Sequence, residues 1–269
     1  PVALTCGNTF VLKPSEKVPL SAMKFAELLA ESGLPEGVFN IVHGDKAAVD
    51  ALLAHPLVRA ISFVGSTNVA RHVYETGTAN GKRVQAAGGA KNHLIIMPDA
   101  DVRLAVQALQ ASAFGCAGER CMAGSLAVPV GRIADDIVEG LCQVGKKMKV
   151  GPTDGGTDVD MGPLISAAHR DRVAGYLDTA RGEGAEVALD GRSFDLPTDG
   201  FLLGPSVVDR VKPEMRLARE EVFGPLLSVV RTSDLEEALD LGRRCEYVNG
   251  ACIFTQSGYA ARPFKRYFN

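Results

Sequence analysis

Short apolar runs alternate with segments of helical periodicity along this chain, and this alternation restricts the fold more than any other feature. Residues 9–12, 38–42 and 60–64 have the pattern of strands, and the segments between them place apolar residues at helical spacing. Strands joined through helices pair in parallel by right-handed crossovers. We therefore predict an α/β protein that opens with a partial Rossmann-like parallel sheet.

A second alternating series follows the glycine pair Gly88-Gly89. Its expected strands lie near residues 94–97, 125–130, 186–189, 206–211, 226–230 and 251–254, and its expected helices over 102–116, 133–147, 167–181 and 235–243. We therefore place a domain boundary at Gly88, between α/β units over 1–88 and 89–269.

Composition excludes several classes of protein. The 269 residues are 46% hydrophobic and 23% charged, with a net charge of -3, so no positive field exists to hold nucleic acid. No apolar run reaches the roughly 18 residues that span a bilayer, and no signal peptide opens the chain, so we expect a cytoplasmic protein with no membrane partner. The chain starts without methionine, inside an expected strand, which predicts a fragment that lacks both ends.

The six cysteines are scattered, without a CxxC pair or a clustered histidine, so we expect no metal site and no disulfide framework. Arg120 directly precedes Cys121, in the run Gly118-Glu119-Arg120-Cys121-Met122-Ala123-Gly124-Ser125. A guanidinium stabilises the thiolate, which is the nucleophilic form of cysteine. Cys121 is therefore a candidate covalent catalyst; the alternative is a buried structural cysteine.

Two turns could hold a dinucleotide, although the chain has no GxGxxG fingerprint. Gly65 and Ser66 lie between an expected strand and an expected helix, where free N–H groups suit a phosphate. Lys13 and Glu16 follow a strand, where a donor and an acceptor could hold ribose hydroxyls. The alternatives are a plain helix N-cap and a solvated surface pair.

Together these motifs resemble the aldehyde dehydrogenase family. The resemblance covers nearly the whole chain and depends on four motifs in order: Gly7-Asn8-Thr9 before Lys13-Pro14-Ser15-Glu16, Phe63-Val64-Gly65-Ser66-Thr67, Cys121, and Glu220-Glu221-Val222-Phe223-Gly224-Pro225. It implies a partial NAD-binding domain over 1–88 and a catalytic domain over 89–269, truncated at its C-terminal end.

The resemblance also assigns roles to residues. Cys121 is the expected nucleophile, Glu221 the acceptor for the nicotinamide ribose and Phe223 the wall beside that ring. The remaining expected cofactor contacts are Lys13, Ser15, Glu16, Lys17, Gly65, Ser66 and Gly88. A carboxylate at Glu16 would repel a 2′-phosphate, which favours NAD over NADP.

One departure from the family pattern concerns water. Aligned on Lys91, the position of the family's general-base glutamate is occupied by Ala87. An acyl-enzyme without that base must pass its acyl group to a nucleophile that ionises more easily, and the thiol of coenzyme A is one. The Gly-Ala-Lys-Asn-His run and the Arg-Cys-Met-Ala run resemble the CoA-acylating methylmalonate-semialdehyde dehydrogenase branch.

Arg120 suits an aldehyde that carries a carboxylate, such as malonate or methylmalonate semialdehyde. The alternative for Arg120 is an ion pair with Glu119 or Asp101, and His93 is expected to be structural rather than a substitute base. We thus expect acetyl-CoA or propionyl-CoA, NADH and CO₂ as products, and a homo-oligomeric whole protein, dimer or tetramer. The alternatives are a CoA-independent dehydrogenase that makes a carboxylic acid and an inactive fragment that keeps the fold; we expect little turnover from this chain alone.

Overall fold

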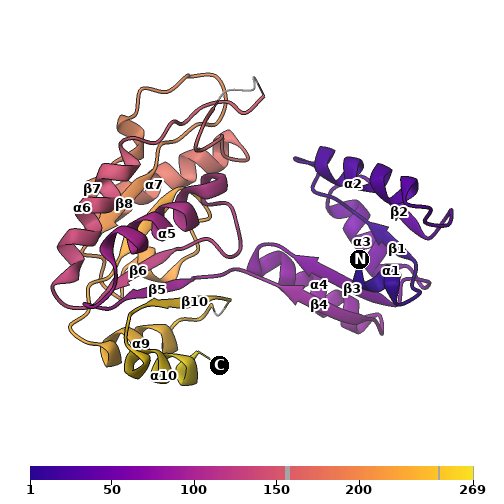
Figure 1. Ribbon diagram of the computed structural model, residues 1–269. Helices are drawn as coiled ribbons and strands as arrows, with labels where there is room; N and C mark the ends of the chain where they lie inside the picture. The colour runs from indigo at the N-terminus through magenta and orange to yellow at the C-terminus, as the bar shows by residue number, and fades with distance from the viewer. Residues whose placement is uncertain (155–157, 248, 269) are drawn as a thin grey trace. The chain divides into compact units, whose positions relative to one another are not determined.

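The computed structural model describes residues 1–154, 158–247 and 249–268. The chain forms two compact units, Pro1–Gly88 and Gly89–Asn269, which we call unit 1 and unit 2 and describe separately. Strands alternate with helices in both units (Figure 1). The predicted α/β class is confirmed. The assignment of unit 1 to NAD binding and of unit 2 to catalysis stays a prediction.

Unit 1 contains two separate pairs of parallel strands. Its elements are α1 (Val2–Thr5), β1 (Phe10–Leu12), α2 (Leu20–Glu31), β2 (Phe39–Ile41), α3 (Lys46–Ala54), β3 (Ala60–Val64), α4 (Thr67–Ala79) and β4 (Arg83–Ala87). Strand β1 pairs with β2, and β3 pairs with β4, each in parallel. The first strand of each pair is followed by a helix, as the alternation predicts.

Unit 2 is built on one six-stranded sheet in the order β10-β5-β6-β9-β8-β7. Its strands are β5 (His93–Ile96), β6 (Leu126–Pro129), β7 (Glu186–Leu189), β8 (Ser206–Asp209), β9 (Leu226–Val229) and β10 (Ala251–Phe254). All neighbours pair in parallel except β7, which is antiparallel to β8 at the edge of the sheet.

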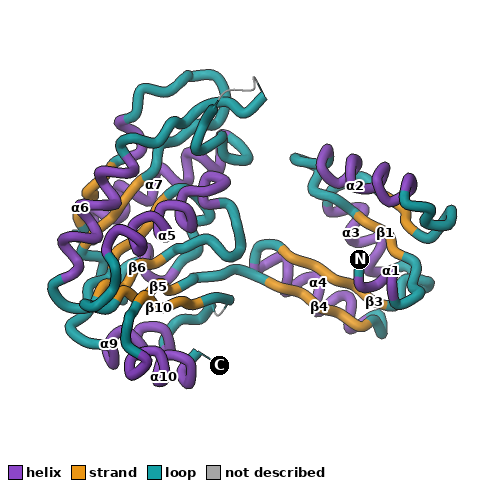
Figure 2. Tube along the Cα trace, viewed as in Figure 1, coloured by secondary structure: helices purple, strands orange, loops and turns teal. Residues whose placement is uncertain are grey.

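Helices cover the sheet of unit 2 (Figure 2, helices purple and strands orange). They are α5 (Val102–Phe114), the 3-10 turn η1 (Gly115–Gly118), α6 (Ile133–Gly145), α7 (Ala167–Glu183), the 3-10 turn η2 (Gly191–Ser193), α8 (Arg216–Arg219), α9 (Leu235–Arg243) and α10 (Gly258–Tyr267). Side-chain caps fix several starts: Asp101 accepts from the Leu104 N–H, and Ser166 accepts from the His169 N–H. Gly184, in the left-handed conformation, ends α7.

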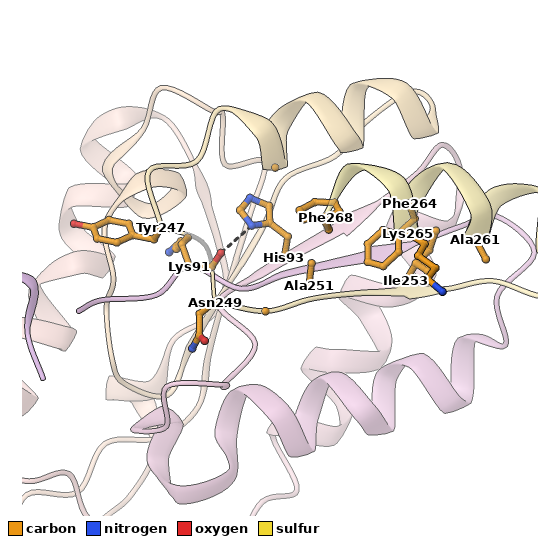
Figure 3. A pocket seen from close by; sticks show the side chains of 12 residues that line it. Lys91, His93, Tyr247, Asn249, Ala251, Ile253, Ala261, Phe264, Lys265 and Phe268 are labelled. Carbon is orange, nitrogen blue, oxygen red and sulfur yellow. Dashed lines mark hydrogen bonds between the residues drawn. The ribbon is translucent and has the colours of Figure 1, made fainter. Parts of the chain in front are cut away.

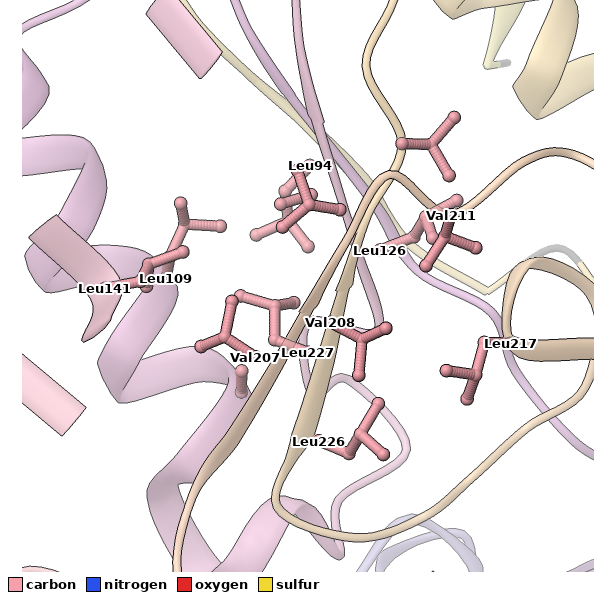
Figure 4. Packing of buried hydrophobic residues seen from close by; sticks show 14 of the residues in the cluster. Leu94, Leu109, Leu126, Leu141, Val207, Val208, Val211, Leu217, Leu226 and Leu227 are labelled. Atoms are coloured by element: carbon pink, nitrogen blue, oxygen red, sulfur yellow. The ribbon is translucent and has the colours of Figure 1, made fainter. Parts of the chain in front are cut away.

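The core of unit 2 forms because its central strands are apolar on both faces. All four residues of β6 and of β9 are buried, as expected for strands covered by helices on both sides. Leu94, Leu126 and Leu227 lie among the clustered side chains that Figure 4 draws, with Leu109 and Leu141 contributed by α5 and α6. This core fixes the strand ends from which the loops of the candidate site leave.

No helix within the described part of the chain combines the length and the apolar character that crossing a membrane requires.

Candidate active site

Cys121 lies in a strained loop between α5 and β6. Cys116, Ala117 and Gly118 adopt positive φ angles of 51°, 51° and 68° in succession. A non-glycine residue in this conformation costs about 1–2 kcal/mol, so the surrounding contacts must hold the loop. Gly118 cannot be replaced without a shift, because an added Cβ would lie 2.2 Å from the Gly224 carbonyl oxygen. The thiol-bearing residue itself is exposed.

Two asparagines hold the backbone at the nucleophile. The Asn92 amide Nδ2 donates to the carbonyls of Cys121 and Ala123 at 2.9 and 2.7 Å. Asn249 donates to the same Cys121 carbonyl at 2.9 Å. Asn92 is 5% exposed, and its Oδ1 has no hydrogen-bond partner within the described chain. The peptide that follows Cys121 is therefore fixed by side chains remote in sequence.

Arg120 directs its guanidinium toward the end of α5. Its Nη2 donates to the carbonyls of Ala111 and Ser112 at 2.6 and 3.0 Å. These carbonyls belong to the last turn of the helix, and that of Ala111 also accepts the Gly115 N–H. Arg120 thus anchors the Cys121 loop to α5 and keeps further donors, because a guanidinium carries five N–H groups. Its predicted contact with a substrate carboxylate stays a prediction.

A narrow depression surrounds Cys121 within unit 2. It is lined by Lys91, Gly118, Arg120, Cys121, Ala123, Gly124, Ser125, Glu221, Val222, Phe223, Gly224 and Leu226. The sequence motifs that contain Cys121, Glu221 and Phe223 are therefore brought together here, although about a hundred residues separate the nucleophile from the other two. A thiol, a carboxylate and an aromatic residue from distant parts of the sequence thus line one depression.

The adjacent glutamates Glu220 and Glu221 have different surroundings. The Glu220 carboxylate is bound by Arg216 at 2.7 Å and accepts the Tyr176 hydroxyl at 2.6 Å. Glu221 lines the depression, where its Oε1 accepts the Ala90 N–H at 3.0 Å. Burial raises the pKa of Glu221, against the lowering effect of the Ala90 N–H and of Lys91. Glu221 is thus the carboxylate placed to accept a hydrogen bond from a ligand.

A larger cavity of about 410 Å³ lies at the edge of the sheet, between β10 and α10. Figure 3 shows Lys91 and His93 toward one end and Phe264 and Phe268 toward the other. His93 is 3% exposed, and its Nδ1 lies 2.8 Å from the Lys91 carbonyl. Burial lowers the pKa of His93 to about 4. The described residues that line this cavity include no cysteine, whereas Cys121 lines the smaller depression, so we assign the chemistry to the depression. His93 has the surroundings of a structural histidine.

Lys91 lines both the larger cavity and the depression around Cys121. Its side chain is 1% exposed, and its Nζ donates to the Glu220 carbonyl at 2.8 Å. Burial lowers the pKa of Lys91 to about 8, against the raising effect of Cys245, Glu221 and Glu220. Lys91 therefore holds the backbone immediately before Glu221.

In unit 1, Lys13 and Glu16 lie after β1 as predicted from the sequence. The Lys13 ammonium lies 3.4 Å from the Glu16 carboxylate and donates to the Gly44 carbonyl at 2.7 Å. A backbone hydrogen bond, and then Lys13, lower the pKa of Glu16, which is exposed and therefore ionised at neutral pH. Ser15 accepts the Lys17 N–H at 3.3 Å. The donor and the acceptor expected at the adenosine ribose are thus neighbours.

Gly65 and Ser66 connect β3 to α4. Position 65 favours glycine, because an added Cβ would lie 2.6 Å from the Phe63 ring. Ser66 occupies the N-cap position, yet within the described chain its hydroxyl makes no cap hydrogen bond to the helix. Gly88 lies against Thr67 at the start of α4, where a Cβ would come within 3.2 Å of the Thr67 backbone. Their cofactor roles stay predictions.

The comparisons with known proteins decide the family. The model of the aldehyde dehydrogenase family matches residues 1–268. The chain belongs to the aldehyde dehydrogenase family. The order of motifs along the sequence had indicated this family, and the match over nearly the whole chain confirms it.

Within this family the chain is similar to semialdehyde dehydrogenases. It is 54% identical to a malonate-semialdehyde dehydrogenase of Pseudomonas aeruginosa, over 98% of this chain and 54% of that protein. A crystal structure of methylmalonate-semialdehyde dehydrogenase from Oceanimonas doudoroffii superposes with a TM-score of 0.95 at 52% identity, over 99% of this chain and 55% of that one.

A second similar structure was solved with NAD bound. A Sinorhizobium meliloti protein assigned as a methylmalonate-semialdehyde dehydrogenase and complexed with NAD gives a TM-score of 0.94 at 48% identity, over 99% of this chain and 55% of that one. This aldehyde dehydrogenase chain spans about half the length of the curated relatives it matches.

Sequence reasoning missed the side chains that hold the site loops of this aldehyde dehydrogenase. For Lys91 and Asn92 the sequence does carry a signal: these two polar residues directly precede an apolar strand, and polar side chains are seldom buried without a specific partner. Asn249, His169 and Arg172 carried none, because their partners lie 50 or more residues away. Only the folded chain identifies them.

Proposed function

We propose that this chain carries the nucleophile and the cofactor contacts of a NAD-dependent, CoA-acylating malonate- or methylmalonate-semialdehyde dehydrogenase. One observation supports this most strongly: the exposed Cys121 thiol shares a depression with Glu221 and Phe223. The names of the most similar relatives agree with a semialdehyde substrate. The whole protein is expected to be a homo-oligomer.

The Cys121 thiolate adds to the aldehyde carbon and produces a tetrahedral alkoxide. The Cys121 backbone N–H stabilises that oxygen, as one donor of an oxyanion hole. The carbonyl clamp of Asn92 and Asn249 keeps the nucleophile loop in one conformation, which costs no reorganisation during the reaction. Collapse of the alkoxide expels a hydride and leaves a thioester on Cys121.

The residues present fit a nicotinamide dinucleotide. The Ala90 N–H donates a hydrogen bond to Oε1 of Glu221. Oε2 of Glu221 accepts no hydrogen bond within the described chain, so it is available to a ribose hydroxyl. In unit 1, Lys13 and Glu16 would hold the adenosine ribose with Lys17 at the same rim, and Ser66 with Gly65 would contact the pyrophosphate. Ser15 and Gly88 are the remaining expected cofactor contacts. NAD, when bound, supplies the acceptor for the hydride.

The acyl group then leaves on a thiol. Ala87 has no group that accepts a proton from water, so the thiolate of coenzyme A attacks the thioester carbon and releases the Cys121 thiolate. The β-carboxylate of the acyl chain is lost as CO₂, and the thioester enolate that remains takes a proton from water, which yields acetyl-CoA or propionyl-CoA. Arg120 is the cation proposed to receive that carboxylate before it leaves.

Thiol exchange tests the proposal without requiring turnover. The chain is incubated with propionyl-CoA, and the acylated residue is located by peptide mass spectrometry. We expect acylation of Cys121, reversal by added coenzyme A and slow loss to water. Cys121→Ser should abolish it, whereas Cys116→Ser, which removes an exposed thiol of the same loop, should not.

The position of the missing base supplies a second arm. Ala87→Glu puts a carboxylate where the resemblance assigns the general base, and we expect it to speed hydrolysis of the acyl-enzyme on the order of a hundredfold. An acyl-enzyme that forms in the unaltered chain but passes rapidly to water, with no return of the acyl group to added coenzyme A, would favour the CoA-independent reaction instead.

A further inference from the structure

One face of α7 contacts the segment that contains both proposed nicotinamide contacts. His169, Arg172 and Tyr176 are spaced three and four residues apart, so their side chains share one face of the helix. The segment that they contact is Glu220–Glu221–Val222–Phe223. This helix has no role in the mechanism proposed above.

The contacts run in reverse order along the segment. The His169 ring Nε2 lies 2.6 Å from the Phe223 carbonyl oxygen. Arg172 Nη2 donates to the Val222 carbonyl at 2.8 Å. The Tyr176 hydroxyl donates to the Glu220 carboxylate at 2.6 Å. The segment therefore runs antiparallel to the helix and is bound at three successive points.

The close packing beyond these contacts depends on Gly224. A Cβ at that position would lie 2.6 Å from a methyl group of Val173, which is 1% exposed on α7. The segment thus approaches the helix too closely for any larger residue at position 224.

His169 also reaches the nucleophile loop. Its Nε2 lies 3.2 Å from Oε1 of Glu119, two residues before Cys121. The same Glu119 oxygen accepts the Ile165 N–H at 3.2 Å. Arg172 Nη2 lies 3.4 Å from His169 Nδ1, and an arginine can only donate, so Nδ1 accepts and Nε2 carries the hydrogen. One imidazole N–H thus faces an acceptor in each of the two site loops.

Phe223 needs such support because of its backbone. Its φ of 57° is in the left-handed region, where a bulky residue costs about 1–3 kcal/mol. The carbonyls of Val222 and Phe223, on either side of the strained residue, are the two that Arg172 and His169 bind. The strain is therefore offset by contacts from a single helix.

We infer that His169 and Arg172 are positioning residues that hold Phe223 in its left-handed conformation and, through Glu119, fix the nicotinamide wall relative to the Cys121 loop. The assignment of Phe223 to the nicotinamide rests on the proposed function; the connection between the two loops does not.

Matched variants of His169 test this inference. His169→Gln keeps an N–H donor near the position of Nε2, and His169→Leu has a similar size with no donor. Asp171→Asn, on an exposed residue of α7, is the control. We measure deuterium uptake of peptides covering residues 119–124 and 220–226, and NAD affinity by calorimetry. Thermal unfolding shows that each variant is folded.

We expect His169→Leu to speed exchange in both peptides and to raise the Kd for NAD about tenfold, the effect of one lost hydrogen bond. His169→Gln should restore most of both properties, and Asp171→Asn should change neither. If His169→Leu does not fold, Arg172→Leu repeats the test from the other donor.

Two results would overturn the inference: unchanged uptake in both peptides, or equal effects of the glutamine and leucine variants. Absence of NAD binding by the unaltered chain would contradict the proposed function instead, while the uptake measurements would still decide whether His169 connects the loops.

Discussion

The two units have the same alternation of strands and helices but differ in how much they bury. In unit 1, whose residues are all described, the buried apolar side chains are Pro14, Leu53, Ala70 and Val73, and α2 has no buried residue. In unit 2, one continuous core covers both faces of a six-stranded sheet. An alternating pattern therefore predicts the elements, while core formation depends on how many strands share a sheet.

The proposed chemistry follows the same division. The strained loop of Cys121 and the left-handed Phe223 lie in unit 2, where a rigid core can hold costly backbone conformations. Apart from the partly buried Lys13, the expected contacts of unit 1 are exposed residues, which need little support. Four predictions sharpen or break this comparison.

The largest difference should come from matched leucine truncations. Leu126→Ala removes a side chain with no exposure from the center of unit 2 and should lower the free energy of unfolding by about 2–5 kcal/mol, because it leaves a cavity. Leu28→Ala, on a residue of α2 that is 52% exposed, should cost less than about 0.5 kcal/mol. Urea unfolding measures both, and equal losses would show that the comparison is wrong.

A buried ion pair should matter more than an exposed one. Arg231 binds both carboxylate oxygens of Asp209, which is 3% exposed, at 3.0 and 2.6 Å. Arg231→Leu leaves this carboxylate without its cation and should cost about 2–3 kcal/mol, reduced because the arginine is partly exposed. Adding Asp209→Asn should recover part of the loss.

The control for that variant is the exposed pair Lys46–Asp50 of unit 1. Lys46→Ala should change the free energy of unfolding by less than about 1 kcal/mol. A loss as large as that of Arg231→Leu would contradict the expected difference between the units.

Acid should destabilise unit 2 through His93. Its pKa is lowered to about 4 in the fold, so the unfolded chain binds the proton first as the pH falls below about 6.5. Between pH 7 and pH 5 this one group should remove about 2 kcal/mol of stability. His93→Gln should reduce the loss over that range by the same amount in urea unfolding, and an unchanged loss would argue against a buried neutral histidine.

The smallest effect concerns two carboxylates with opposite shifts. Burial raises the pKa of Glu221, whereas a backbone hydrogen bond and Lys13 lower that of Glu16. As the pH falls, Glu221 is protonated before Glu16 and becomes a weaker acceptor for the ribose hydroxyl that we propose it binds. NAD affinity should therefore weaken about threefold through Glu221 before Glu16 contributes. In calorimetric titrations over pH, Glu221→Gln should remove this early loss, and Glu16→Gln should keep it.

Sequence patterns predicted much of the fold because the relevant signals are local. The strand β6 and the helix α7 are readable from a few neighbouring residues and a Ser166 cap. The antiparallel pairing of β7 and the separation of unit 1 into two strand pairs were not readable, since both depend on which edges meet in space.

The candidate site was predictable where a motif carries it and hidden where a long-range contact does. Cys121, Glu221 and Phe223 belong to recognisable runs, and the depression contains all three. The direction of the Arg120 guanidinium toward α5 was not predictable, because it depends on a helix end nine residues back and the path of the loop between them.

By itself, the amino-acid sequence determined the α/β class, the family and the chemical types of the candidate residues, since periodicity and motif order are properties of neighbours along the chain. Only the tertiary structure decided which glutamate faces the depression, which asparagines clamp Cys121 and which helix holds Phe223. Those choices depend on hydrogen bonds between residues tens of positions apart, and such bonds form only after the apolar strands have packed.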